Sequence, residues 1–448
     1  MQAITQYLNG RGYTCVQDDY YSRIELWKKW YGGKVPSVHN YTQYNGRRKL
    51  RRTRKSLGLA KTVSEDWANL ILNEKFQIGV DKASAKKKID AVLVSNEFAK
   101  RGNQLVELAF ALGTGAFVEY LDGDDVKIDY IRAGMIYPIS WDNGRVLECA
   151  FASERAAGKQ KKIYLNIHRL EAGKYVIENH LFDRNGEILT ETNLPDGVVP
   201  EVRTNSSVPR FQIFTPNIAN NIDPDSPLGI SVYANALDQL ESADLVYDSY
   251  CNEFRLGRKR ITVPISMARM AMEEDGTSTP VFDDNDTEFY AVPQDDKSEN
   301  KILEHNMEIR SEAHDTGIQT MLNLVSWKTG SGGKRYVFRR DGQVRTATEV
   351  ISENSDLYRN LKKHEISLEA ALLGMIDSIA DLLHLGTVKA SVSFDDSIIS
   401  DTDSDKMTFL QEIRDGVRQK WEYRVKFFGE DTETAKAMVE SGADLTFG

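Results

Sequence analysis

The residues best suited to chemistry lie in a glycine-rich, basic segment at positions 328–345. Six cations stand there against one acid, Asp341: Lys328, Lys334, Arg335, Arg339, Arg340 and Arg345. Cations spaced in this way bind the phosphates of a nucleic-acid backbone without reading the base sequence. The segment is equally compatible with a flexible surface loop that its charge keeps soluble. Local charge leaves both interpretations open.

A second basic run lies at 47–55, where seven of nine residues are Lys or Arg and none is acidic. It precedes a predicted helix at 60–74. The run could bind phosphates. It could also be a segment that faces solvent or a partner protein, and the sequence favours neither interpretation.

The sequence lacks the signatures of nucleotide-binding and metal enzymes. Four Gly-Lys pairs lack the flanking residues of a Walker A motif: 33–34, 158–159, 173–174 and 333–334. The Gly-Ser-Gly-Gly stretch at 330–333 resembles a phosphate-binding loop in composition alone, since no βαβ unit surrounds it. The seven histidines and three cysteines have no metal-type spacing. The sequence therefore predicts no enzyme and no cofactor.

One acidic segment approaches the pattern of a calcium loop. Carboxylates fall at positions one, three, five and twelve: Asp401, Asp403, Asp405 and Glu412. Position six is Lys406, where the sharp turn of such a loop requires glycine. The same acids would suit the N-terminal cap of a helix that begins at Asp405.

A neighbouring acidic pair gives the alternative function. Asp395 and Asp396, together with Asp401, could hold a catalytic magnesium ion in a metal-dependent DNA-processing enzyme. Nothing else in the sequence organises a nuclease site around these carboxylates.

The overall composition describes a folded, acidic protein, with 41% hydrophobic residues, 28% charged residues and a net charge of −10. A chain of 448 residues exceeds one ordinary core, so two or three substructures are expected. No apolar run is long enough to predict a membrane-spanning helix, and residues 1–21 lack a signal core, which predicts cytosolic synthesis. The negative total argues against a protein that coats nucleic acid through bulk charge, so any DNA contact is expected to be local.

The elements that would position these residues change character along the chain. Helical spacing predicts helices within 1–35 and at 60–74, 82–101 and 106–112. Period-two alternation then predicts one antiparallel sheet, with strands at 117–120, 127–131, 147–151, 162–167 and 174–178. Helices followed by strands indicate an α+β class.

Two unusually long helical patterns frame the basic segment at 328–345. They cover 227–260 and 346–384, or roughly 50 and 60 Å at about 1.5 Å per residue. A shorter helix is predicted at 302–327, and a turn-rich insert at 261–301 carries strands at 260–264 and 288–292. A long lone helix is poorly supported, so the first should pack on the shorter helix or on copies of itself.

Several stretches together resemble a known family. They are Trp27–Gly33, Lys61–Glu74, Gly229–Tyr233, Arg258–Pro264, Thr346–Val350 and Ser393–Ile398. In this order and spread over nearly the whole chain, they resemble portal proteins of tailed double-stranded DNA bacteriophages, particularly long-tailed phages of Gram-positive hosts. Another structural head protein, without a DNA channel, is a further alternative.

The resemblance implies a mixed α+β, ring-forming portal fold, with an α/β wing, a two-helix stem, a small α/β clip, a long kinked helix and a helical crown. The implied parts are a wing at 1–225, stem helices at 226–260 and 302–327, a clip at 261–301, a tunnel loop at 328–345, the long helix and a return strand at 346–396, and a crown at 397–448. Gly374 is the candidate for the kink.

The resemblance also implies partners and a place of action. The ring, usually of twelve subunits, would stand at the portal vertex of the capsid in the virion, after assembly in the host cytoplasm. It would pass double-stranded DNA without sequence specificity and dock the terminase large subunit, then the head–tail connector protein. Major capsid and scaffolding proteins are further expected partners, and no membrane is expected.

Overall fold

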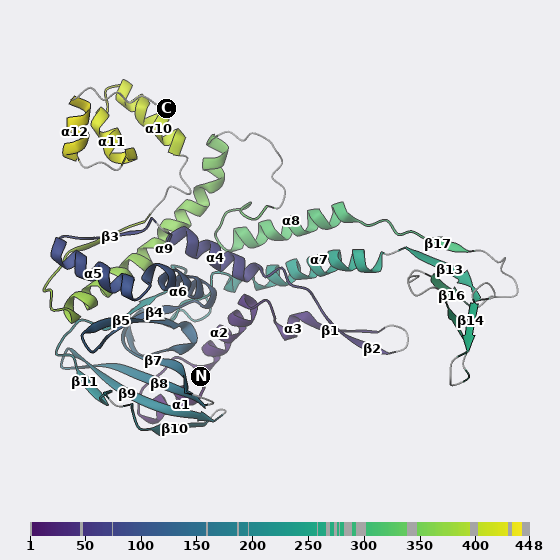
Figure 1. Cartoon of the computed structure of the whole chain (residues 1–448), viewed down its shortest axis with the longest axis horizontal. Coiled ribbons are helices and arrows are strands. Elements are labelled where there is room, and N and C mark those ends of the chain that lie inside the picture. The colour runs from purple at the N-terminus through teal and green to yellow at the C-terminus, as the bar shows by residue number, and fades with distance from the viewer. Residues whose placement is uncertain are drawn as a thin grey trace.

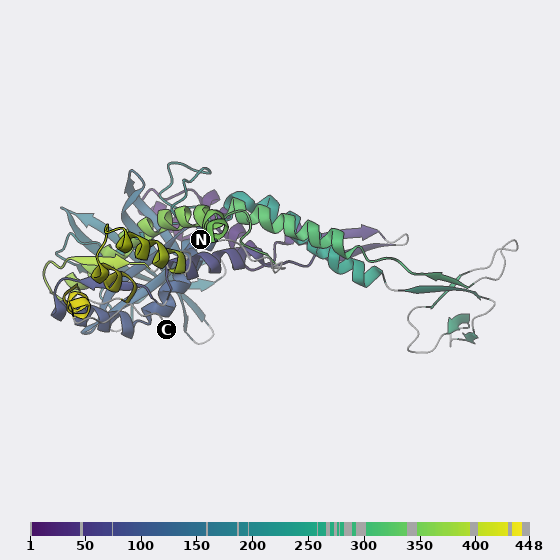
Figure 2. The same ribbon diagram turned by 90° about the horizontal axis from the view of Figure 1, so that it is seen from above.

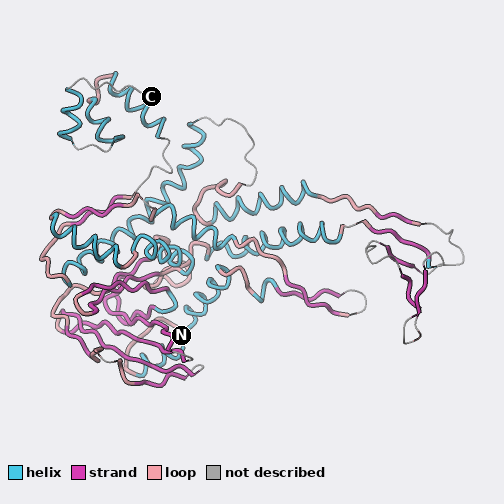
Figure 3. Tube along the Cα trace, in the orientation of Figure 1, coloured by secondary structure: helices cyan, strands magenta, loops and turns pink. Residues whose placement is uncertain are grey.

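A computed structural model describes residues 2–44, 48–73, 75–157, 160–185, 188–195, 197–257, 259–265, 269–272, 276, 278–281, 289–292, 302–337, 347–394, 402–428 and 432–440. The molecule is elongated, with a body of helices and sheets from which two helices extend as a stalk to a group of short strands (Figures 1 and 2). In the view of Figure 3, most strands of the body gather below its helices, and a short helix near the N-terminus lies among them. The predicted mixed α+β class is confirmed.

The body begins with helices. These are α1 (Gln2–Gly10), α2 (Asp18–Tyr31), α3 (Pro36–His39), α4 (Leu59–Ile71), α5 (Ala83–Ser95) and α6 (Phe98–Leu112). The prediction of one helix over 82–101 is wrong. Asn96 ends α5, because its side-chain amide donates to the Val92 and Val126 carbonyls while its side-chain oxygen accepts the Ile128 amide. Glu97 then adopts a left-handed φ of 50°, which no continuous helix allows.

The predicted single sheet is two sheets. One has the order β12-β4-β5, from Phe211–Phe214, Gly115–Asp122 and Asp125–Arg132. The other sheet has six strands: β6 (Ile136–Asp142), β7 (Arg145–Ala157), β8 (Gln160–Glu171), β9 (Lys174–Asn185), β10 (Ile188–Thr192) and β11 (Glu201–Arg203). Five of them lie in the order β10-β9-β8-β7-β6, and β11 also pairs with β9. The 3-10 turn η1 at Ala133–Met135 separates β5 from β6. The later strand β12 pairs with the free edge of β4, a long-range contact that local alternation cannot reveal.

A continuous hydrophobic core joins both sheets to α2, α4, α6 and the long helix α9 (Ala347–Leu382). At its centre the ring of Trp67 from α4 stacks on Phe110 from α6, and His364 from α9 meets both rings edge-on. The prediction of a long helix at 346–384 is confirmed. This core fixes α9 to the body.

The stalk consists of α7 (Leu237–Leu256) and α8 (Ser311–Lys328). The predicted start of the first helix at 227 is wrong, because the preceding residues are held by the body instead. The Tyr20 hydroxyl donates to the carbonyls of Leu228 and Gly229, and the Val232 amide donates to the Phe110 carbonyl. Only the 3-10 turn η2 (Ala234–Ala236) precedes α7.

The second stalk helix also starts later than its predicted start at 302. Residues Leu303–His305 form β17, which pairs antiparallel with β13 (Arg260–Pro264), and β16 (Phe289–Val292) pairs parallel on the other side of β13. The predicted strands at 260–264 and 288–292 are thus confirmed, the second shorter by one residue. A separate pair, β14 (Arg269–Met272) and β15 (Ser278–Val281), completes this distal group.

After α9 the chain returns to the body. Strand β18 (Ala390–Ser393) pairs with β3 (Gln77–Val80), and α10 (Thr402–Arg414), α11 (Lys420–Phe428) and α12 (Thr432–Glu440) follow. Gly374 lies inside α9, where a Cβ would stand 2.3 Å from the Gln212 side-chain oxygen. The Gln212 side chain therefore packs directly against Gly374, and the kink stays a prediction. None of the helices described here is both long and apolar enough to cross a membrane.

Candidate nucleic-acid interface

The basic segment starts where α8 ends, and its first residues fold back on that helix. The Ser326 hydroxyl donates to the Gly332 carbonyl at 2.6 Å and accepts the Arg335 amide at 3.2 Å. Gly330 and Gly332 have φ values of 81° and 85°, which favour glycine. The described part of the segment ends at residue 337; Arg339, Arg340 and Arg345 lie outside the described residues.

This turn is docked on two body helices. The Trp67 indole of α4 donates to the Thr329 carbonyl at 3.2 Å, and the Asn360 amide of α9 donates to the Gly330 carbonyl at 2.9 Å. Residues 329 and 330, at the start of the basic segment, are therefore held between α4 and α9 by hydrogen bonds that involve none of the cations of the segment.

Arg335 has a specific partner in the body. Its Nε donates to Asp66 Oδ2 at 2.9 Å and its Nη2 to Asp66 Oδ1 at 2.7 Å, a two-bond fork that suits the planar guanidinium. The hydrogen bonds to Asp66 raise the pKa of Arg335, and burial raises the pKa of Tyr336, whose hydroxyl lies 3.4 Å from the same carboxylate. In this arrangement Arg335 anchors the segment, a role its sequence neighbours did not indicate.

Two other cations of the segment are exposed. Lys328 stands 5.5 Å from the ring centre of Trp327, and Lys334 precedes the anchored Arg335. The structure thus brings Lys334 and Arg335 to the same docked turn and leaves Lys328 at the end of α8.

The second basic run forms a hairpin of β1 (Asn40–Tyr44) and β2 (Lys49–Thr53). At its root, Arg54 donates to the Val38 carbonyl at 2.8 Å and stacks over the Tyr41 ring. These two strands are not among the elements predicted from the sequence.

The hairpin root is attached to the stalk helix α7. The Lys55 amide donates to Asp248 at 3.1 Å, and the Leu57 amide donates to Asp244 at 2.7 Å. His39 reaches the other Asp244 oxygen at 2.9 Å. These contacts span about 190 to 205 residues of sequence, so no local pattern could have revealed them.

A model of the family described as phage portal protein, SPP1 Gp6-like, matches residues 16–421, which is most of the chain. The chain belongs to this family. Among solved structures, one titled neck of empty GTA particle, computed with C6 symmetry, matches with a TM-score of 0.43 and 10% identity over 82% of this chain and 88% of that one. A TM-score below 0.5 is too low to support a conclusion about the fold or function of this chain. No curated protein matches.

The family match confirms the resemblance drawn from the dispersed sequence stretches. The chain is a phage portal protein, a structural component of the phage particle, and the basic segment and hairpin are elements of that portal protein.

The portal protein also contains a buried polar group between β4, β8 and α9. The carboxyl group of Glu119 is fully buried with Ser378 and Arg210 as polar neighbours, and burial raises its pKa to about 8. Nearby, Arg210 donates to the Ser378 carbonyl at 3.0 Å and pairs with Asp381. Burial also lowers the pKa of His168 to about 3. Protonated Glu119 and neutral His168 are the forms this interior favours.

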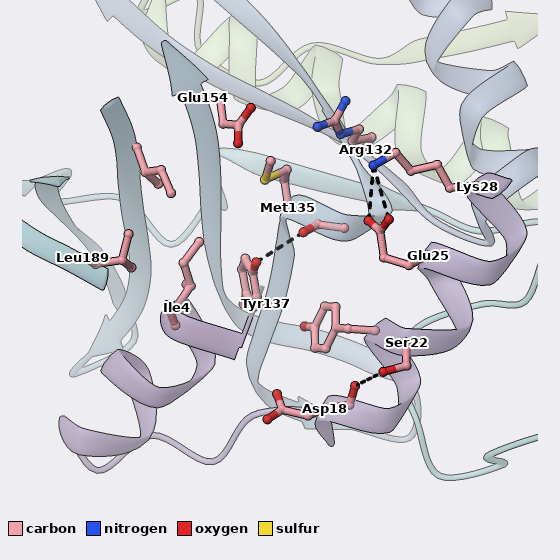
Figure 4. Close-up of a pocket in the computed structure, with 14 residues that line it drawn as sticks. Ile4, Asp18, Ser22, Glu25, Lys28, Arg132, Met135, Tyr137, Glu154 and Leu189 are labelled. Atoms are coloured by element: carbon pink, nitrogen blue, oxygen red, sulfur yellow. Dashed lines mark hydrogen bonds and ion pairs between the residues drawn. The ribbon is translucent and has the colours of Figure 1, made fainter. Parts of the chain in front are cut away.

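A crevice of about 430 Å³ lies between α1, α2 and the six-stranded sheet (Figure 4). Its polar groups pair with one another: Lys28 donates to the Glu25 carboxylate at 3.3 Å, and the Ser22 hydroxyl donates to the Asp18 carbonyl at 3.3 Å. None of the described residues that line it is a histidine or a cysteine.

Most of the acidic candidates for metal chemistry lie outside the described residues. Asp395, Asp396 and Asp401 lie outside the described residues, as do the side chains of Asp403 and Asp405. Within the part of the chain that the structure describes, no three His, Cys, Asp or Glu side chains converge on a metal position.

Proposed function

We propose that this portal protein forms a ring, of twelve subunits, at one vertex of the phage head, and that double-stranded genomic DNA enters and leaves through its centre. The observation that carries the proposal is the stalk: two paired helices that leave apolar side chains uncovered and end at an anchored basic segment. In a ring, such stalks would stand side by side around a channel.

The exposed apolar residues of the stalk support assembly. Leu245 of α7 is 49% exposed, and Leu324 and Trp327 of α8 are 38% and 63% exposed. Leu324 and Trp327 are three residues apart on one helix face, and adjacent exposed apolar groups are typical of a surface that a partner covers. Adjacent stalks in a ring would cover them.

The parts of the chain then take distinct roles. The wing would comprise 1–225, the stem 226–260 and 302–327, the clip 261–301, and the crown 397–448, with 346–396 forming the long helix and its return strand. The clip, at the far end of the stalk, would dock the terminase large subunit and later the head–tail connector protein. The wing would face the major capsid and scaffolding proteins.

DNA contact would be confined to the loop at 328–345. A channel lined throughout with cations would hold DNA by releasing its counterions and would oppose sliding. In an acidic protein, salt limits the reach of each loop to roughly 8 Å. Lys328, Lys334, Arg339, Arg340 and Arg345 would touch phosphates, while Arg335 would hold the base of the loop through Asp66.

The first test is the shape of the purified chain in negative-stain electron microscopy. The proposal expects rings with a central hole. Monomers at all protein concentrations would contradict it.

The second test reverses the charge of loop cations in the triple variant K334E/R339E/R340E. Rings should persist, and DNA packaging in a phage complementation assay should fall at least tenfold. Arg335 is left intact because its reversal would break the Asp66 contact. The matched control K87E/K88E/K100E applies the same charge change to exposed lysines of α5 and α6, and equal packaging by both variants would refute DNA contact by the loop.

A further inference from the structure

We propose that the basic hairpin at 40–53 is an arm that binds the acidic, exposed face of α7 on a neighbouring copy of this chain. The proposal rests on the ring of the proposed function and names a contact within it. It assigns a role to the second basic run, which the loop at 328–345 leaves unexplained.

The first observation is the hairpin's isolation. Every residue of its two five-residue strands is exposed or half-buried. Both views show the hairpin projecting from the body alongside the stalk (Figures 1 and 2). A two-stranded hairpin that packs on nothing is marginally stable in water. A lasting contact with another protein surface would supply the missing support.

The second observation is the arm's charge. No acid occurs between residues 40 and 55. Lys49 and Arg51 alternate with Leu50, so both point to one face of the hairpin, and both are exposed. Such a face is complementary to an acidic protein surface.

The third observation is the composition of α7, which has five acids and no Lys or Arg from 237 to 254. Asp244 and Asp248 hold the root of the chain's own hairpin, and Glu253 pairs with Arg310. The other two acids are exposed and form no ion pair with the described residues.

Those two acids are Asp238 and Glu241, which are three residues apart and therefore share a face of the helix. The exposed Leu245 follows one turn after Glu241. This face offers two carboxylates beside an apolar group, which complements Lys49 and Arg51.

The attachment at the root keeps the arm extended. The Val35 amide donates to His39 Nδ1 at 2.8 Å, so His39 carries its proton on Nε2 and donates it to Asp244 at 2.9 Å. With its root fixed in this way, the arm presents its cations outward. Arm and acidic face are different surfaces of one chain, so their contact is head-to-tail, the type of contact that builds a ring when its rotation closes.

A nucleic acid is the competing partner, and two arguments favour the neighbouring copy. Arginine and tyrosine, both present in the arm, are enriched in protein interfaces. Phosphate binding by a strongly basic arm beside the stalk would also hold DNA where it should slide.

The test is a charge exchange, read by mass photometry of purified protein at about 0.15 M salt. K49E/R51E and D238K/E241K should each lower the fraction of protein in rings at least fivefold. Combining all four substitutions should restore rings, because the two surfaces regain opposite charge. The control K87E/K88E on α5 should assemble like the unaltered chain. Circular dichroism melts establish that each variant is folded.

Each outcome decides between explanations. Unchanged rings in K49E/R51E, or no restoration in the fourfold variant, would overturn the arm contact. Intact rings together with weaker DNA binding by K49E/R51E, measured by fluorescence anisotropy with a 30-base-pair duplex, would assign the arm to nucleic acid instead. Monomers in the unaltered chain would contradict the proposed ring itself.

Discussion

At the scale of single residues, partners in space decide what a charged side chain does. Arg335 belongs by sequence to a cluster of cations, yet its guanidinium is bound by Asp66, 269 residues away. Lys334, its neighbour, is exposed. Arg335 thus has a structural partner that its place in the sequence does not indicate, so it should be altered separately from Lys334 in experiments.

Glu119 gives a prediction about pH. Its pKa is raised to about 8 by burial, whereas the unfolded chain ionises this group near its ordinary 4.5. The folded state therefore keeps a proton that the unfolded state loses, so the stability from Glu119 falls as pH rises towards 8, by at most about 1.4 kcal/mol per pH unit. The melting temperature of E119Q should fall less than that of the unaltered chain between pH 6.5 and 8.

His168 does not affect stability between pH 6.5 and 8, because burial lowers its pKa and the folded and unfolded states differ in its protonation only at lower pH. Its contribution is lost only as pH falls below about 6.5 towards 3. Identical pH profiles for E119Q and the unaltered chain would show that Glu119 does not retain its proton.

At the scale of elements, close backbone contacts set where the stalk begins. Gly113 ends α6 with a φ of 90°, and Gly229 lies against it just before the stalk. A Cβ on Gly229 would stand 2.4 Å from the Gly113 carbonyl oxygen, a distance no side chain tolerates. The joint between body and stalk therefore depends on the absence of side chains.

G229A should accordingly lower the free energy of unfolding by about 2 kcal/mol or more, because backbone must move to accept the methyl group. Chemical denaturation monitored by circular dichroism measures the change. G333A is the matched control, since a Cβ there meets nothing within 4 Å and the substitution should be nearly neutral. Equal effects of the two substitutions would argue against the tight joint.

At the scale of the whole molecule, an elongated chain with a two-helix stalk has more surface than its core can cover. Trp327 is the largest exposed apolar side chain of the stalk. In a ring it would be buried between subunits, where tryptophan often contributes strongly to binding.

W327A should therefore weaken assembly while leaving the monomer stable. We expect at least a tenfold rise in the protein concentration needed for ring formation, measured by analytical ultracentrifugation, with a melting temperature of the monomer within a few degrees of the unaltered chain. T320A, on the same helix, removes an exposed polar group and serves as the control. Rings that form equally well in W327A would place this residue outside the subunit interface.

Local patterns in the sequence predicted elements whose own residues suffice to define them. The long helical pattern at 346–384 and the alternation at 147–151, 162–167 and 174–178 are such cases. The resemblance to phage portal proteins could also be recognised from the sequence, because it depends on the identity of residues at particular places along the chain.

The tertiary structure decided the rest, because it depends on contacts between distant residues. Residues 227–233, predicted as part of the stalk helix, are bound to the body instead. Strand β12 pairs with β4, and Asp66 forms hydrogen bonds with Arg335. The same is true of the hairpin root, which Asp244 and Asp248 hold from about 190 residues away. Periodicity reports only which face of a segment is buried, whereas the partner that buries it or neutralises its charge is set when the whole chain folds.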